Sequence, residues 1–125
     1  MPGFFPHLIA GFALFLSGRF IFRSYFEEKN KTKDSFILLI VCLVFTFIPD
    51  MFLIIYYVVH LLPFRTLVNY HIFTHLIIIP IAIVALIIIN FLTDIKRKPI
   101  WTMGLISIIV HIIMDLFISD TSIWI

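Results

Sequence analysis

The stretch NYHIFTHLIII, residues Asn69 to Ile79, places two histidines four residues apart at the start of an apolar run that continues to about Leu92. A helix needs about 20 predominantly apolar residues to cross a bilayer, and this run is long enough. Because residues at i and i+4 share a helix face, His71 and His75 are expected to lie together on one face. Ionisable side chains are costly in a bilayer, so the pair indicates a polar site among membrane helices.

Composition extends this interpretation to the whole chain. Of its 125 residues, 62% are hydrophobic and only 13% are charged, which is a smaller charged share than soluble domains carry. The net charge is only +2 and the basic residues sit in short loops, which argues against a nucleic-acid partner. The single cysteine, Cys42, excludes a disulfide framework. We predict one all-α, polytopic transmembrane domain over residues 1–125.

Four apolar regions predict about four transmembrane helices. Their approximate bounds are Phe4 to Phe22, Ser35 to Leu62, His71 to Leu92 and Pro99 to Ile118. The second region is too long for one straight span, so Pro49 is expected to kink or break it. Residues 51–64 would then form a tilted, re-entrant or interfacial half-helix, and five spans are the alternative. No basic segment precedes the first apolar region, which is expected to stay as a span rather than be cleaved as a signal peptide.

The basic residues predict the orientation. The segments RSYFEEKNKTKD, residues 23–34, and TDIKRKP, residues 93–99, hold seven of the nine lysines and arginines. Short loops rich in lysine and arginine face the cytoplasm. We therefore expect a multi-pass protein of the cell's inner membrane, with both segments on the cytoplasmic side and both termini outside.

The ionisable residues inside the apolar runs share a depth. With a rise of about 1.5 Å per residue, those of all four regions lie about 15–26 Å from the cytoplasmic end of their helices. Helices without a common site would not be expected to carry ionisable residues at the same depth. A shared site in the outer half of the membrane explains the common depth. The residues concerned are His7, Asp50, His75, His111 and Asp115.

The spacing adds a second argument. His111 and Asp115 repeat the i, i+4 spacing of His71 and His75, and two such pairs on facing helices can surround one or two ions. Imidazole and carboxylate ligands suit zinc, manganese or iron, and zinc is the ion we favour. Asp50 would add a carboxylate beside the helix break. A helix-bundle core is a familiar place for such a site.

Purely structural roles are the alternative to a metal site for some of these residues. A membrane histidine often only forms a hydrogen bond between helices, and this reading is favoured for His60. His71 stands at the start of its predicted helix, where water could reach it. His75 and His111 could also be axial ligands of a haem in a four-helix electron-transfer protein. A non-catalytic membrane subunit is the third alternative.

Four stretches, in this order, resemble motifs of the YdjM-like family of inner-membrane proteins to which metal-dependent hydrolase activity is ascribed. They are PHLIAGFAL (6–14), IPDMF (48–52), YHIFTHLII (70–78) and HIIMDLF (111–117). The family motifs are His-Leu-x-x-Gly, Pro-Asp-x-Asp, His-Arg-Gly-x-Thr-His-Ser and His-x-x-x-Asp. The chain departs from them at Phe52, which replaces the second acidic residue, at Tyr70, which replaces the first histidine of the third motif, and at Leu76, which replaces its serine.

The resemblance implies metal ligands at five positions, and a shift of one residue adds His71. Those five are His7, Asp50, His75, His111 and Asp115. The expected function is a membrane-embedded metal-dependent hydrolase that cleaves a phosphoester of a membrane lipid at the outer interface. Asp50 or Asp115 would act as general base, and His71 or His7 would protonate the leaving group or complete the metal shell. A homo-oligomer could help to enclose the site.

Overall fold

The computed structural model describes residues 4–27, 31–50, 63–94 and 97–117, and these residues form helices joined by short turns, with no strand among them. The predicted all-α class is confirmed. The half-helix expected over residues 51–64 and His60 lie almost entirely outside the described residues. The elements are α1 (Phe4–Ile21), α2 (Arg23–Glu27), α3 (Thr32–Phe47), η1 (Ile48–Asp50), α5 (Phe64–Phe73), η2 (Thr74–Ile78), α6 (Ile79–Leu92) and α7 (Lys98–Phe117).

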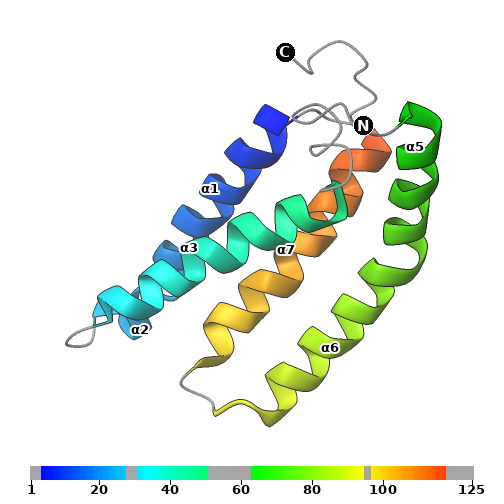
Figure 1. Ribbon diagram of the computed structural model, residues 1–125. Helices are drawn as coiled ribbons and strands as arrows, with labels where there is room; N and C mark the ends of the chain where they lie inside the picture. Colours follow the sequence, from blue (N-terminus) through cyan, green and yellow to red (C-terminus); the bar gives the residue numbers. More distant parts are fainter. Residues whose placement is uncertain (1–3, 28–30, 51–62, 95–96, 118–125) are drawn as a thin grey trace.

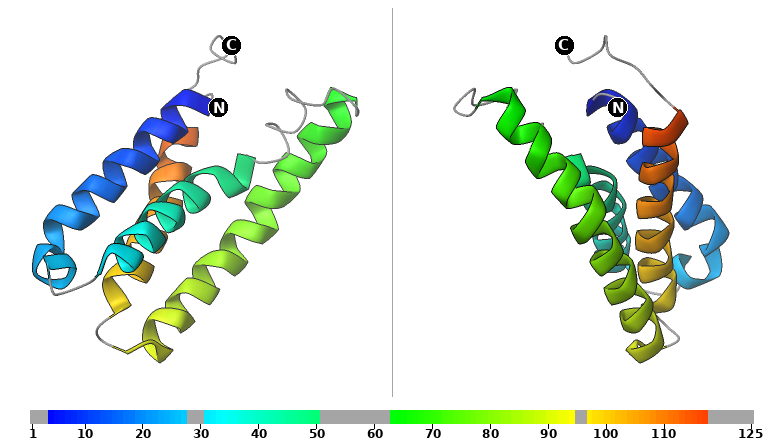
Figure 2. Two further views of the ribbon diagram at one scale, coloured as in Figure 1. Left: turned by 60° about the vertical axis from the view of Figure 1, so that its left-hand side comes forward. Right: turned by 90° about the vertical axis from the view of Figure 1, so that its right-hand side faces the viewer.

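The long helices run alongside one another in alternating directions (Figure 1). Helices α3 and α7 pack against each other at the centre, α1 packs on both of them, and α6 packs on α7. The start of α1, the end of α3, α5 and the end of α7 lie at one end of the bundle, as the further views also show (Figure 2). Helix α2, the start of α3 and the turn between α6 and α7 lie at the other end, which we call the basic end. Arg23, Lys31, Lys33, Arg97 and Lys98 stand there.

Three helical segments are long and apolar enough to cross a membrane. They comprise 19, 25 and 20 residues, over Thr32–Asp50, Val68–Leu92 and Lys98–Phe117, and Phe5–Ile21 is a shorter apolar helix beside them. Large apolar side chains cover the outside of the bundle, as at Phe91, which is 82% exposed. A bilayer tolerates such a surface, which would be costly in water. The polytopic membrane architecture follows.

Glycines let the helices approach closely, as membrane helices often do. A Cβ atom added to Gly11 on α1 would lie 2.9 Å from Leu43 Cδ2 and 3.0 Å from Thr46 Oγ1, both on α3. A Cβ atom added to Gly104 on α7 would lie 3.0 Å from Val41 Cγ1. All three distances are shorter than Cβ contacts normally are, so Gly11 and Gly104 set how near α1 and α7 come to α3.

Prolines shape two of the helices that carry the site. Pro49 stands where α3 tightens into the 3₁₀ turn η1, which confirms the predicted break of the second helix. In η2 the Ile79 N–H donates to the Thr74 carbonyl five residues back, as in a π-helix. The wide turn fits the ring of Pro80, which has no N–H and would crowd the carbonyl four residues before it in an α-helix.

The third long helix begins earlier than predicted. It starts at Phe64, after Pro63 in extended conformation (φ −60°, ψ 136°), rather than at about His71. The polar residues of FRTLVNY hid these two turns from a search for apolar runs. His71 therefore stands well inside a helix and not at its start.

Candidate metal centre

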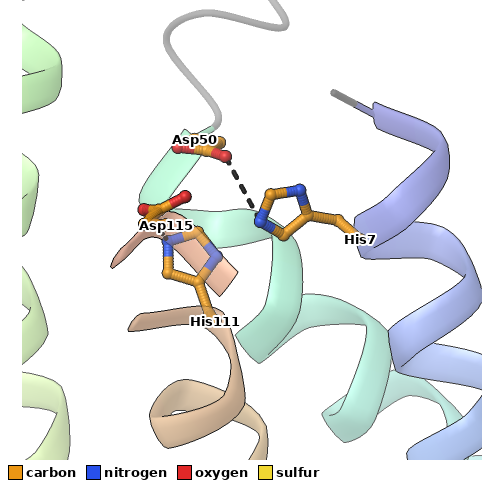
Figure 3. Close-up of side chains that lie close together, drawn as sticks. All are labelled: His7, Asp50, His111 and Asp115. Carbon is orange, nitrogen blue, oxygen red and sulfur yellow. Dashed lines mark ion pairs between the residues drawn. The ribbon is translucent and has the colours of Figure 1, made fainter. Parts of the chain in front are cut away.

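Six ionisable side chains meet at the end of the bundle away from the basic loops. His7 comes from the first turns of α1, Asp50 ends η1, and the remaining four are His71 of α5, His75 of η2, and His111 and Asp115 of α7. Figure 3 shows the side chains of His7, Asp50, His111 and Asp115 directed toward one another from three separate elements. The shared depth predicted from the helical rise thus corresponds to a single cluster.

Three of these side chains form a tight triangle. His75 Nε2 lies 3.1 Å from His111 Nε2 and 2.8 Å from Asp115 Oδ2, and His111 Nε2 lies 3.2 Å from Asp115 Oδ2. His111 is fully buried, whereas the side chains of His75 and Asp115 are 22% and 14% exposed. The triangle therefore forms the part of the cluster nearest the protein surface.

Backbone carbonyls fix which ring nitrogens carry protons. His75 Nδ1 lies 3.0 Å from the His71 carbonyl, and His111 Nδ1 lies 3.1 Å from the Thr46 carbonyl. A carbonyl can only accept, so in both rings Nδ1–H donates and, in the neutral ring, Nε2 carries a lone pair. The two lone pairs and the Asp115 carboxylate then face one another without a proton between them, and only a shared proton or a cation makes this arrangement favourable.

Sequence explains why the Thr46 carbonyl is available. A 3₁₀ turn pairs each carbonyl with the N–H three residues later, and three residues after Thr46 stands Pro49, which has no N–H. The carbonyl accepts from His111 instead. Metal-ligating histidines commonly donate their second ring N–H in this way, to a carboxylate, a carbonyl or water.

Asp50 occupies the buried side of the cluster. Its Oδ2 lies 3.5 Å from His7 Nε2, and its Oδ1 lies 3.3 Å from His71 Nδ1 and 3.9 Å from His75 Nε2. Asp50, His7 and His71 are each only 1% exposed. Among the described residues, neither oxygen of Asp50 and neither ring nitrogen of His71 has a hydrogen-bond partner. A buried carboxylate without donors is costly unless a cation or a proton compensates it.

The separations fit a metal ion. Ligands about 2.0–2.1 Å from zinc, at angles of about 90–110°, lie about 2.9–3.4 Å from one another. The triangle's edges and the distance between His71 Nδ1 and Asp50 Oδ1 fall close to this range. Two groups can each hold an ion, with ligand atoms within 4.8 Å of one another. They are His7, Asp50, His111 and Asp115, and Asp50, His71 and His75.

Two threonines that sequence reasoning missed support the cluster. The buried Thr74 hydroxyl lies 2.9 Å from the Pro49 carbonyl and 2.7 Å from the His71 carbonyl, so its proton ties η1 to the helix that carries both histidines. Thr46 offers its carbonyl to His111, and its hydroxyl donates within α3. A search for polar residues three or four positions from His71 and Asp50 would have found both threonines.

An apolar cluster underlies the centre on the α6–α7 side. It consists of the buried Ile79, Leu86 and Ile108, which lie three or more residues toward the basic end from His75 and His111. Partly buried side chains such as Ile112 pack against it. On this side, the centre is closed toward the basic end of the bundle.

All six predicted site residues are brought together. The alternative in which His71 is simply wetted at a helix start is wrong, because His71 is buried and lies about two turns beyond the start of α5 at Phe64. The Nε2 atoms of His75 and His111 are too close for axial ligands on opposite faces of a haem, which speaks against that alternative. Comparisons with protein-family models, with curated proteins and with solved structures found no match to this chain.

Proposed function

We propose that this chain is a metal-dependent hydrolase of the inner membrane that cleaves a phosphoester of a membrane lipid in the outer half of the bilayer. The observation that carries the proposal is the triangle of His75, His111 and Asp115. Its two imidazoles are oriented by backbone carbonyls so that their lone pairs converge on a carboxylate. This is the donor arrangement of a metal site whose ligands have their supporting hydrogen bonds.

The ligand set favours zinc, with manganese or iron as alternatives, because it combines imidazoles and carboxylates without a thiolate. A divalent ion held there would supply Lewis acidity and make water a nucleophile near neutral pH. The protein's own residues would hold and orient it: His75, His111 and Asp115 at the partly exposed face, and His7, Asp50 and His71 behind them. The described site residues include no serine or cysteine that could serve as a nucleophile.

Acid–base roles follow from position. Asp50 can accept a proton through whichever oxygen does not bind metal, and His71 lies 3.3 Å from it, within reach of a short proton transfer. Asp115 is the alternative base at the exposed face, and His7 is the alternative acid. The resemblance to the YdjM-like family supports this class of reaction. A lipid is the substrate class expected because the bundle's outer surface is apolar around the site, as at Leu76, which is 72% exposed.

The test begins with metal content. Detergent-purified protein without a histidine tag and never exposed to chelator would be analysed by inductively coupled plasma mass spectrometry. We expect near-stoichiometric zinc, manganese or iron in wild type and its loss from His75→Ala and Asp115→Ala. Thr102→Val is the matched control, because Thr102 bonds Asn90 in the other half of the bundle.

Activity would then be measured as headgroup or phosphate release from phospholipid vesicles containing the same proteins. Hydrolysis that requires both metal ligands would support the proposal. Folded wild-type protein without bound metal would refute it and favour a non-catalytic subunit with a hydrogen-bonded polar core. Metal without hydrolysis of any lipid phosphoester would refute the proposed reaction but keep the metal centre.

A further inference from the structure

The carboxylate of Asp50 faces two different groups of ligands. Its Oδ2 is directed to His7, at 3.5 Å from Nε2, and its Oδ1 is directed to His71, at 3.3 Å from Nδ1. The two possible metal groups of the centre overlap only in this residue. A carboxylate placed between two ligand groups, with one oxygen toward each, has the geometry of a bridging ligand.

One ion cannot compensate all the buried polar atoms of the centre. An ion among His7, Asp50, His111 and Asp115 leaves His71 with both ring nitrogens buried and without a hydrogen-bond partner among the described residues. An ion between Asp50, His71 and His75 leaves His111 Nε2 facing the Asp115 carboxylate at 3.2 Å without a proton of its own. Each arrangement leaves buried polar atoms uncompensated, which is costly.

We infer that the centre holds two divalent ions bridged by Asp50, the first bound also by His7, His111 and Asp115 and the second by His71 and His75. This inference rests on the metal centre of the proposed function and not on its acid–base assignment. With both Asp50 oxygens and His71 bound to ions, these two residues would not exchange protons with substrate. Two-metal hydrolytic sites hold their ions about 3.5–4 Å apart, a distance that one bridging carboxylate can span.

The two positions have different ligand counts. The first has four protein ligands, which is typical of closed sites, and the second has three, which is typical of sites that keep a place for water or substrate. His75, a ligand of the second position, has the most exposed side chain of the cluster at 22%. The second ion is therefore the one nearer to substrate, and it also lacks a fourth protein ligand to hold it. We expect it to bind more weakly and to exchange first.

The net charge of the two-ion centre favours one class of substrate. The described ligands are two carboxylates and four imidazoles, so one divalent ion gives a neutral centre and two ions leave it with two positive charges. A positive centre at the edge of a low-dielectric bundle attracts anions. A two-ion centre therefore favours an anionic phosphoester over a neutral carboxylic ester, and inorganic phosphate should bind to it.

The experiment counts ions in the full chain in detergent. Protein without a tag would be loaded with Mn²⁺, desalted and analysed for manganese by mass spectrometry. We expect about two ions per wild-type chain, about one in His71→Ala and about two in the control Asn90→Ala, which alters a polar residue of the opposite half. Electron paramagnetic resonance of the wild type gives a second readout that needs no variant, because neighbouring Mn²⁺ ions couple and an isolated ion does not.

The outcomes separate the inference from the proposed function. One ion per wild-type chain with an uncoupled spectrum would overturn the two-ion centre and leave a one-metal hydrolase intact. Two uncoupled ions would likewise overturn the bridge through Asp50. No bound ion in folded protein would overturn both. Two coupled ions in protein that hydrolyses no phosphoester would support the centre and refute the reaction.

Discussion

The Thr74 hydroxyl offers the most specific test of how the centre is supported. It lies between the Pro49 carbonyl, at 2.9 Å, and the His71 carbonyl, at 2.7 Å, and so connects the turn that carries Asp50 to the helix that carries His71 and His75. Thr74→Val keeps the shape of the side chain and removes the hydroxyl. We expect this change to loosen the position of Asp50 relative to His71 while the fold is retained.

The size of the effect follows from the bond that is lost. A hydrogen bond contributes about 1 kcal/mol, and those between membrane helices average about 0.6 kcal/mol. The His71 carbonyl keeps the backbone N–H of Thr74 and His75 Nδ1–H as donors, so the loss falls mainly on the Pro49 carbonyl. Supporting residues of metal sites typically change affinity by about 10–100-fold, and the small energy here places Thr74→Val below that range, at about three- to fivefold weaker binding.

The assay is a titration of Zn²⁺ against a chelating dye, with purified metal-free protein in detergent. Thr74→Ser, which keeps the hydroxyl, should bind as the wild type does. Thr102→Val controls for the loss of any intramembrane hydroxyl. Wild-type affinity in Thr74→Val, or equally weak binding in Thr74→Ser and Thr74→Val, would refute the argument that this hydroxyl positions the centre.

Three further predictions concern packing, metal removal and orientation. Gly11→Val should destabilise the protein by about 1–3 kcal/mol and lower its melting temperature, because the added Cβ would meet Leu43 and Thr46. The control Ala13→Val, at an exposed position of the same helix, should leave the melting temperature unchanged. Equal melting temperatures for the two variants would contradict this prediction. Removing metal with EDTA should lower the melting temperature, and free Zn²⁺ at about 100 times its dissociation constant should restore about 2.7 kcal/mol; an unchanged transition would argue against a bound ion. In a Cys42→Ser background, an impermeant thiol reagent added to intact cells should label Asn69→Cys but not Ser24→Cys, and the reverse pattern would invert the orientation.

The metal centre could be predicted from the sequence because, in a helix, the number of residues between two side chains determines their relative depth and face. The rise per residue is constant along a helix, so the depth of His7, Asp50, His75 and His111 could be compared before any fold was known. The i, i+4 pairs showed which side chains share a face. The break at Pro49 was also predictable, because proline lacks the N–H that an α-helix needs.

The remaining features depend on contacts between helices. The extra residue of the π-turn cannot be read from THLII, since Pro80 only disfavours α-geometry and packing decides how the helix responds. The role of Thr74 depends on a carbonyl 25 residues earlier in the chain. The start of α5 was missed because Arg65 and Asn69 broke the apolar pattern, although Pro63 marks the boundary.

The π-turn η2 also changes the rotation of α5 relative to α6, the two halves of one long helix. Each residue of an α-helix turns the chain by about 100°, so one extra residue lets the segment with His71 face Asp50 independently of how α6 is rotated against α7. Removing Ile77 would restore continuous α-geometry. If α6 then kept its packing against α7, His71 and His75 would rotate away from the other ligands. If the histidines kept their positions, α6 would present a different face to α7. The single inserted residue therefore lets one helix both pack against α7 and direct His71 and His75 toward the other ligands.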